Sequence, residues 1–214
     1  YYQSRYVEKG MKHKVFYNFI NFYKFSVTVN TVMLAKYKFF LLAIANCGLM
    51  TKNIAKSAYK INSLTLSNLI KEDIILINSK SLLFGKITTI YTLTDKSKKY
   101  IKIAGKSLYK TDVSQLEHDY LLLKSYSVLP YALQNTWLNE TELKEIYKNT
   151  ATTDGLFLMD NKLIGVEILT TNYSKDTIKS KMQFANTYCD KLITLNTKDI
   201  KIRKENKSIE RYTY

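Results

Sequence analysis

Two acidic residues, Asp154 and Glu167, occupy positions on neighbouring predicted strands from which they could hold a metal ion. Residues Thr153–Met159 and Lys162–Leu169 are predicted strands, with the tight turn Asp160-Asn161 between them. Such a hairpin can bring the carboxylate at the start of the first strand close to the carboxylate on the second. Carboxylate oxygens are ligands of hard cations such as Mg²⁺. The same pair would also suit a solvated surface, so the pattern leaves both interpretations open.

The elements that must position these residues occur in an order that resembles the PD-(D/E)XK nuclease fold, which is helix, three strands, helix, strand. The predicted elements are Val113–Leu129, Gln134–Asn139, a short helix Glu140–Tyr147, the two hairpin strands, a helix from Ser174 or Lys175 to Asp190, and Lys191–Leu195. The resemblance implies that Asp154 and Glu167 hold Mg²⁺ and that a lysine activates water. Leu169 stands where that lysine is expected, so Lys181 on the following helix is its predicted replacement. Glu117 is the predicted third carboxylate.

The first half of the chain has the pattern of a winged helix-turn-helix. Its predicted helices are Met33–Cys47, Lys52–Tyr59 and Ser63–Lys71, and its predicted strands are Ile74–Ile77, Leu82–Phe84 and Ile87–Thr92, with Asn78–Ser81 and Gly85-Lys86 as connections and a further helix Asp95–Ile103. In such a module the third helix enters the major groove, and the wing contacts phosphates or the minor groove. The predicted DNA-binding residues are Ser63, Thr65, Ser67, Asn68, Lys71, Lys80 and Lys86. The alternative is a module that packs against another protein.

The net charge favours a polyanionic partner. Thirty-three Lys and Arg residues against 18 Asp and Glu give a net charge of +15 and a pI of about 9.5. Double-stranded DNA is therefore the predicted partner, and its binding requires no cofactor, whereas a nuclease activity would require Mg²⁺. The abundance of Lys, Asn, Ile and Tyr also suits an AT-rich genome, which would account for part of the excess.

Several short motifs together resemble the replication-relaxation protein family of plasmids and conjugative elements. They are Tyr91-Thr92-Leu93-Thr94, Glu117-His118-Asp119, Trp137-x-Asn139-Glu140, Thr153-Asp154-Gly155, Gly165-Val166-Glu167 and Lys181, and they cover roughly Thr31 to Asn196. The resemblance implies a DNA-binding protein that assists replication, relaxation or conjugative transfer, with a relaxase or replication protein as partner. Thr153 stands where the family commonly has Pro, and Leu169-Thr170-Thr171 replaces an acidic residue and a Gly. These departures favour a nuclease-like domain without catalysis; the alternative is a Mg²⁺-dependent endonuclease or nickase.

The remaining residues complete the predicted organisation. His118 would be a general acid or base if it faced the carboxylates, and otherwise a hydrogen-bonded packing residue. Trp137 is predicted in the core, and Cys47 and Cys189 are predicted buried thiols, which fits a reducing cytoplasm. No stretch is apolar for long enough to span a membrane. The predicted fold is α+β, with an aromatic helical extension (1–30) that could form a homodimer, a winged helix-turn-helix (31–105), a PD-(D/E)XK-like domain (106–200) and a basic tail (201–214).

Overall fold

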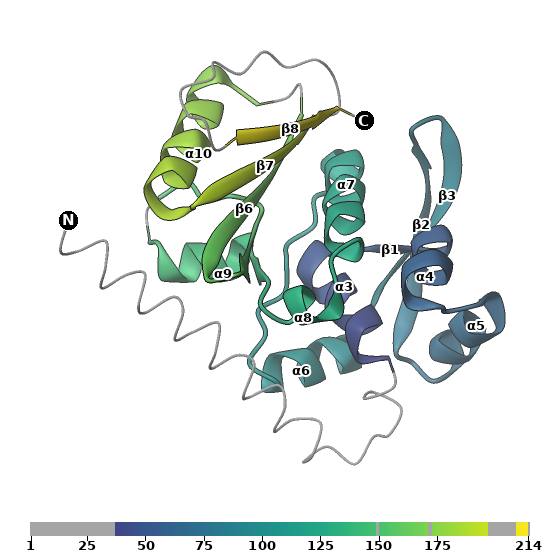
Figure 1. Cartoon of the computed structure of the whole chain (residues 1–214). Coiled ribbons are helices and arrows are strands. Elements are labelled where there is room, and N and C mark those ends of the chain that lie inside the picture. The colour runs from purple at the N-terminus through teal and green to yellow at the C-terminus, as the bar shows by residue number, and fades with distance from the viewer. Residues whose placement is uncertain (1–36, 149, 171–172, 197–208, 214) are drawn as a thin grey trace. The chain divides into compact units, whose positions relative to one another are not determined.

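The computed structural model describes residues 37–148, 150–170, 173–196 and 209–213 (Figure 1). Contacts between these residues divide the chain after Gln134 into an N-terminal unit (37–134) and a C-terminal unit (135–213). Each unit combines helices with its own sheet, so the fold is mixed α+β, as the sequence predicts. The predicted extension 1–30 and the start of the predicted helix Met33–Cys47 lie outside the described residues.

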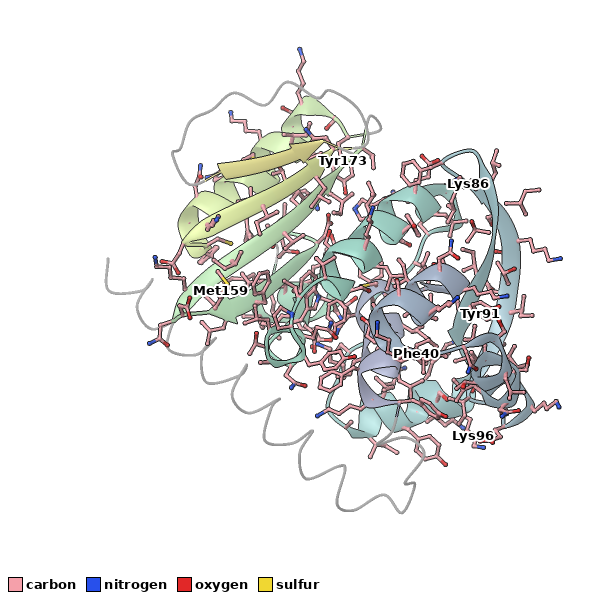
Figure 2. All side chains as sticks on the ribbon, turned by 45° about the vertical axis from the view of Figure 1, so that its right-hand side comes forward. Phe40, Lys86, Tyr91, Lys96, Met159 and Tyr173 are labelled. Carbon is pink, nitrogen blue, oxygen red and sulfur yellow. The ribbon has the colours of Figure 1, made fainter. Side chains whose placement is uncertain are left out.

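The N-terminal unit is built around α3 (Lys38–Cys47), which is buried from Phe40 to its end. The helix ends at Gly48, whose φ of 79° lets its backbone amide donate to Ile44 O. Figure 2 shows Phe40 in the interior of this unit, where its ring contacts Tyr59 edge-on. An almost entirely apolar sequence therefore forms the central helix, and the more polar helices surround it.

Three helices of this unit have the predicted bounds, because each begins at a polar side chain that accepts a hydrogen bond from a backbone amide of the first turn. The helices are α4 (Lys52–Tyr59), α5 (Ser63–Lys71) and α6 (Asp95–Ile103), and their caps are Thr51, Asn62 and Thr94. None of the helices that the structure describes is both long and apolar enough to cross a bilayer.

The sheet of the N-terminal unit consists of β1 (Met50–Thr51), β2 (Ile75–Leu83) and β3 (Lys86–Leu93), in the order β1-β3-β2. The predicted connection Asn78–Ser81 is wrong, since these residues continue β2. The pairing register instead shifts between Ile77 and Ser79, which is a β-bulge. The polar residues of this stretch therefore mark a bend in one long hairpin and not a turn between two strands.

A further helix of the N-terminal unit is α7 (Leu116–Ser127), which follows a single 3₁₀ turn (Val113–Gln115) and packs against α3. The sequence places this helix in the nuclease-like domain, whereas its contacts place it with the preceding residues. The predicted strand Gln134–Asn139 is wrong in its first four residues, because only Leu138 and Asn139 form a strand. Its first residue belongs to the one-turn helix α8 (Tyr131–Gln134), because Pro130 begins a helical turn whose carbonyl accepts from the amide of Gln134.

The C-terminal unit has a five-stranded sheet in the order β4-β5-β6-β7-β8. Its elements are β4 (Leu138–Asn139), α9 (Glu140–Ile146), β5 (Gly155–Met159), β6 (Lys162–Leu169), α10 (Lys175–Tyr188), β7 (Lys191–Asn196) and β8 (Ile209–Thr213). The pair β5 and β6 is an antiparallel hairpin, whereas β7 is parallel to both β6 and β8. The sequence predicts residues 201–214 as a basic tail, and within this segment Ile209–Thr213 form the strand β8.

Helices α9 and α10 supply one apolar layer of the C-terminal unit. Phe184 of α10 packs with Leu156 and Leu163 of the hairpin and with Leu143 and Tyr147 of α9. Because side chains alternate along a strand, residues 154, 156 and 158 lie on this same face, as do 163, 165 and 167. The predicted metal ligands therefore face α10.

Trp137, predicted in the core, is buried and stacks on Phe157, and its indole ring fills the space beside Gly155. We expect Gly155→Ala to destabilise the protein by about 1–3 kcal/mol, because the added methyl group would overlap the ring. Urea denaturation measures the loss. In a Trp137→Phe background, which removes the overlapping ring atoms, the same substitution should be better tolerated. An equal loss in both backgrounds would show that the close approach of the indole is not the cause.

Candidate functional site

The structure brings Asp154, Glu167 and Lys181 together in the C-terminal unit. Gly155 pairs with Val166, and this register places Asp154 opposite Glu167 at the open end of the hairpin, away from its turn. Nζ of Lys181, on α10, lies 2.9 Å from Oδ1 of Asp154 and 2.7 Å from Oε1 of Glu167. The two acidic residues are only 1% and 0% exposed, so their interpretation as a solvated surface pair is wrong. The three side chains form one buried ion cluster, which we call the carboxylate–lysine cluster.

The backbone fixes the orientation of both carboxylates. Oδ2 of Asp154 accepts a hydrogen bond of 2.7 Å from the amide of Ile168, and Oε2 of Glu167 accepts one of 3.2 Å from the amide of Asp154. Each carboxylate thus uses one oxygen on the neighbouring backbone and turns the other to a shared point, where the ammonium of Lys181 lies. Charge-assisted hydrogen bonds of this kind hold a side chain in a single geometry.

The electrostatics of the cluster keep Lys181 charged. Burial lowers the pKa of its ammonium, but the charges of Asp154 and Glu167 outweigh burial, and the pKa lies well above its usual value. The ring of Tyr173, which sequence reasoning missed, covers the ammonium at 5.2 Å from Nζ to the ring centroid. Burial and the charge of Asp154 raise the pKa of the Tyr173 phenol, which therefore stays neutral. No sequence motif marks this tyrosine among the 18 in the chain.

The donor set suits one small cation. Two carboxylate oxygens converge on one point, and Mg²⁺ is commonly bound by one or two carboxylates with water completing its shell. Among the described residues, no group of three or more His, Cys, Asp or Glu side chains could hold a metal ion. A metal bound at this point would have Asp154 and Glu167 as protein ligands, in the place that the ammonium of Lys181 occupies.

Two residues predicted to assist this cluster lie in the N-terminal unit and have partners there. Oε1 of Glu117 accepts a hydrogen bond of 3.2 Å from the amide of Phe84, at the turn of the β2–β3 hairpin. His118 is buried, and its Nδ1 lies 3.1 Å from Oδ1 of Asp119, which also accepts from the hydroxyl of Tyr109 at 2.9 Å. The structure thus favours the interpretation of His118 as a hydrogen-bonded packing residue and gives Glu117 a structural contact.

The predicted DNA-binding residues lie on the outer surface of the N-terminal unit. Helix α5 buries Leu66 and Leu69 and presents the opposite side to solvent, where Ser63, Ser67, Asn68 and Lys71 are exposed and Thr65 is half-buried. Lys80 lies within β2 and is exposed. Lys86 begins β3 and is also exposed (Figure 2). Leu64, which is 70% exposed, shares the face of Ser67, Asn68 and Lys71. Sequence reasoning missed it, because an apolar residue in an amphipathic helix is expected in the core.

The excess positive charge is divided unequally between the units. Residues 37–134 contain 14 Lys and no Arg against six Asp and Glu, which gives a net charge of +8. Residues 135–213 contain 13 Lys and Arg against 11 Asp and Glu, which gives +2. Since a polyanion is attracted to the more basic surface, the surface with the exposed α5 face is the stronger candidate for binding it.

In comparisons with known proteins, no family model, curated protein or solved structure matches the chain.

We expect Lys181→Met to destabilise the protein by about 3–5 kcal/mol at neutral pH, because two buried carboxylates would lose their counter-ion. The matched control is Lys179→Met, which removes an exposed lysine from the same helix. Its effect should stay within about 0.5 kcal/mol. Denaturant unfolding of the three proteins provides the measurement. Equal stability of the two variants would contradict the burial of an essential charge.

The stabilisation should also depend on pH. Because the pKa of Lys181 is higher in the folded protein than its usual value of 10.5, its contribution is complete below pH 10.5 and is lost only as the pH rises through the folded value. The difference between wild type and Lys181→Met should therefore persist at pH 7 to 9 and decrease in more alkaline solution.

Proposed function

We propose that the protein binds double-stranded DNA through the N-terminal unit, which acts as a winged helix-turn-helix. In this proposal α5 is the recognition helix and the β2–β3 hairpin is the wing. The exposed face of α5, together with the concentration of positive charge in this unit, is the observation that carries the proposal. Asn68 would read adenine, and Leu64 would contact a thymine methyl group. Lys71, Lys80 and Lys86 would contact phosphates.

The arrangement of the elements supports the same proposal. Helices α4 and α5 are joined by a turn of three residues, and the hairpin follows α5 after a turn in which the amide of Ile74 donates to Leu69 O. A short connection of this kind holds one helix across the end of the next, and DNA-binding modules use that arrangement to present the second helix to the major groove.

The biological role that we propose comes from the resemblance of the short motifs. The protein would assist replication, relaxation or conjugative transfer of a plasmid or mobile element, with a relaxase or replication protein as partner. The C-terminal unit would then be a PD-(D/E)XK-like scaffold. Its cluster supports this, because the ammonium of Lys181 already occupies the point between the carboxylates where a metal would bind.

The salt dependence of DNA binding tests the proposal. Neutralised phosphates release counterions, so affinity for a duplex should fall steeply with salt, and the slope of log K against log salt should become shallower by roughly 0.9 for each phosphate contact removed. The variant Lys71→Ala/Lys80→Ala/Lys86→Ala should therefore bind more weakly and with a shallower slope. Fluorescence anisotropy with a labelled duplex measures both quantities.

The matched control for this experiment removes the same charge from the other unit. Lys162, Lys175 and Lys179 are exposed lysines of the C-terminal unit, and their triple alanine variant should keep the wild-type slope. An equal change in both triple variants would mean that net charge alone drives binding. Wild-type protein without affinity for duplex DNA at low salt would refute the proposed function.

A second function is favoured by one observation, the convergence of two buried carboxylates and a lysine. A metal-dependent DNA endonuclease or nickase would hold Mg²⁺ on Asp154 and Glu167. The bound metal would supply a water of lowered pKa for hydrolysis of a phosphodiester. Lys181, displaced from between the carboxylates, would remain close enough to bind a phosphate oxygen.

Cleavage of a supercoiled plasmid distinguishes the scaffold from the enzyme. If the site is catalytic, nicking should require Mg²⁺ or Mn²⁺ and should be lost in Asp154→Asn and Glu167→Gln. Asp160→Asn is the matched control, because it removes an exposed carboxylate from the turn of the same hairpin at a φ of 49° that Asn tolerates. Plasmid that stays intact with either metal, or that is cut equally by all variants, would remove the enzymatic candidate.

A further inference from the structure

The tip of the β2–β3 hairpin, which we define as Leu82–Ile87, exposes large apolar side chains. Leu82 and Ile87 are 66% and 80% exposed, and they are direct cross-strand partners, so they lie side by side on one face. Leu83 points to the opposite face and is buried. Two exposed aliphatic side chains that are direct cross-strand partners form a small apolar surface at the tip, which an apolar partner could cover.

The tip contacts α7 at two points. Leu83 pairs with Lys86, which leaves Phe84 and Gly85 as a two-residue loop, and their φ values of 47° and 75° are those of a type I′ turn. The amide of Phe84 is held by Glu117, and its ring contacts Tyr120 at 5.9 Å between centroids. Both anchoring residues lie on α7, so the tip is fixed to the body of the N-terminal unit by a carboxylate and by a ring contact.

Positive charge lies beside the apolar pair. Lys80 lies two residues before Leu82 on the same face of β2, opposite Thr89, whereas Lys86 pairs with Leu83 and points to the other face of the hairpin. Both lysines are exposed. An aliphatic pair with an ammonium group beside it matches the minor groove of a duplex, whose rims carry phosphates and whose base steps can accept an inserted apolar side chain.

The length of the hairpin is sufficient for this contact. The eight residues of β3 span about 26 Å at roughly 3.3 Å per residue. Helix α5 packs at the base of the hairpin, where the amide of Ile74 bonds to Leu69 O. With α5 in the major groove, the adjacent minor groove lies about half a helical turn away, which is roughly 17 Å.

From this geometry we infer that Leu82 and Ile87 form a wedge that enters the minor groove and bends the DNA. The inference rests on the proposed function and adds to it that the protein deforms its DNA. Aliphatic side chains inserted at a base step partly unstack it and kink the duplex towards the major groove. The wedge should favour flexible pyrimidine–purine steps such as TA.

The test is a measurement of DNA bending with the full chain. A duplex of about 30 base pairs with a central TA step carries a donor and an acceptor dye at its two ends, so that bending raises the energy transfer. Wild-type protein should raise the transfer, and Leu82→Ser/Ile87→Ser should return it towards that of free DNA while binding persists. Replacing TA by a GC-rich centre should weaken the bend made by wild type.

The matched control replaces two other exposed aliphatic residues of the N-terminal unit, Ile103 and Val128, which are 72% and 75% exposed. Ile103→Ser/Val128→Ser should bend the duplex as wild type does. Because the wedge carries no charge, the Leu82→Ser/Ile87→Ser variant should bind with reduced affinity but with the wild-type salt slope. Unchanged thermal unfolding of both double variants would verify that they are folded.

Each outcome has a separate meaning. Binding by wild type without a rise in energy transfer, or equal bending by wild type and Leu82→Ser/Ile87→Ser, would overturn the wedge and leave the proposed DNA binding intact. Absence of any duplex binding by wild type would overturn the proposed function and the wedge together. Loss of the bend in the hairpin variant alone is the result that we expect.

Discussion

The C-terminal unit depends on a single charge arrangement, the ammonium of Lys181 between the carboxylates of Asp154 and Glu167. These groups come from α10, from the residue before β5 and from β6, so the ion cluster ties the helix to the hairpin at one point. Two buried acids without this counter-ion would be strongly unfavourable. The apolar layer around Phe184 adds non-directional contacts, whereas the cluster specifies which turn of α10 lies over the strands. The ion cluster therefore determines where α10 lies on the strands. Apolar burial supplies most of the free energy that holds the helix there.

Hydrogen bonds from backbone amides to carboxylates also occur in the N-terminal unit. In both units a carboxylate accepts a hydrogen bond from the backbone amide of a distant segment: Asp154 from Ile168, Glu167 from Asp154, and Glu117 from Phe84. Such a bond fixes a segment that the local sequence would leave adjustable. In the C-terminal unit it aims two oxygens at one point, and in the N-terminal unit it fixes the tip of a hairpin. Preorganisation of this kind serves binding as much as catalysis, so the geometry of the cluster is compatible with a scaffold.

Most of the correct predictions rest on local sequence features, namely helix caps and tight turns. The bounds of α4, α5 and α6 follow from their caps, and the hairpin of β5 and β6 follows from the turn Asp160-Asn161, both of whose residues have positive φ. The errors arose where tertiary contacts decide. The polar run Asn78–Ser81 has the composition of a turn, but its pairing with β3 keeps it extended. No local pattern identifies Tyr173 or Leu64. The contact of Tyr173 with Lys181 and the exposure of Leu64 both depend on the tertiary structure.

The division of charge connects these features to function. A near-neutral unit attracts a polyanion less strongly than a unit with a net charge of +8. If the protein is the proposed DNA-binding protein, the electrostatic attraction for DNA would therefore come mainly from the N-terminal unit. In the proposed complex, lysines would give affinity without sequence preference, and the exposed α5 face would add readout of base edges. The proposed wedge at the hairpin tip would make a third contribution, because an uncharged wedge distinguishes duplexes by the energy needed to deform them.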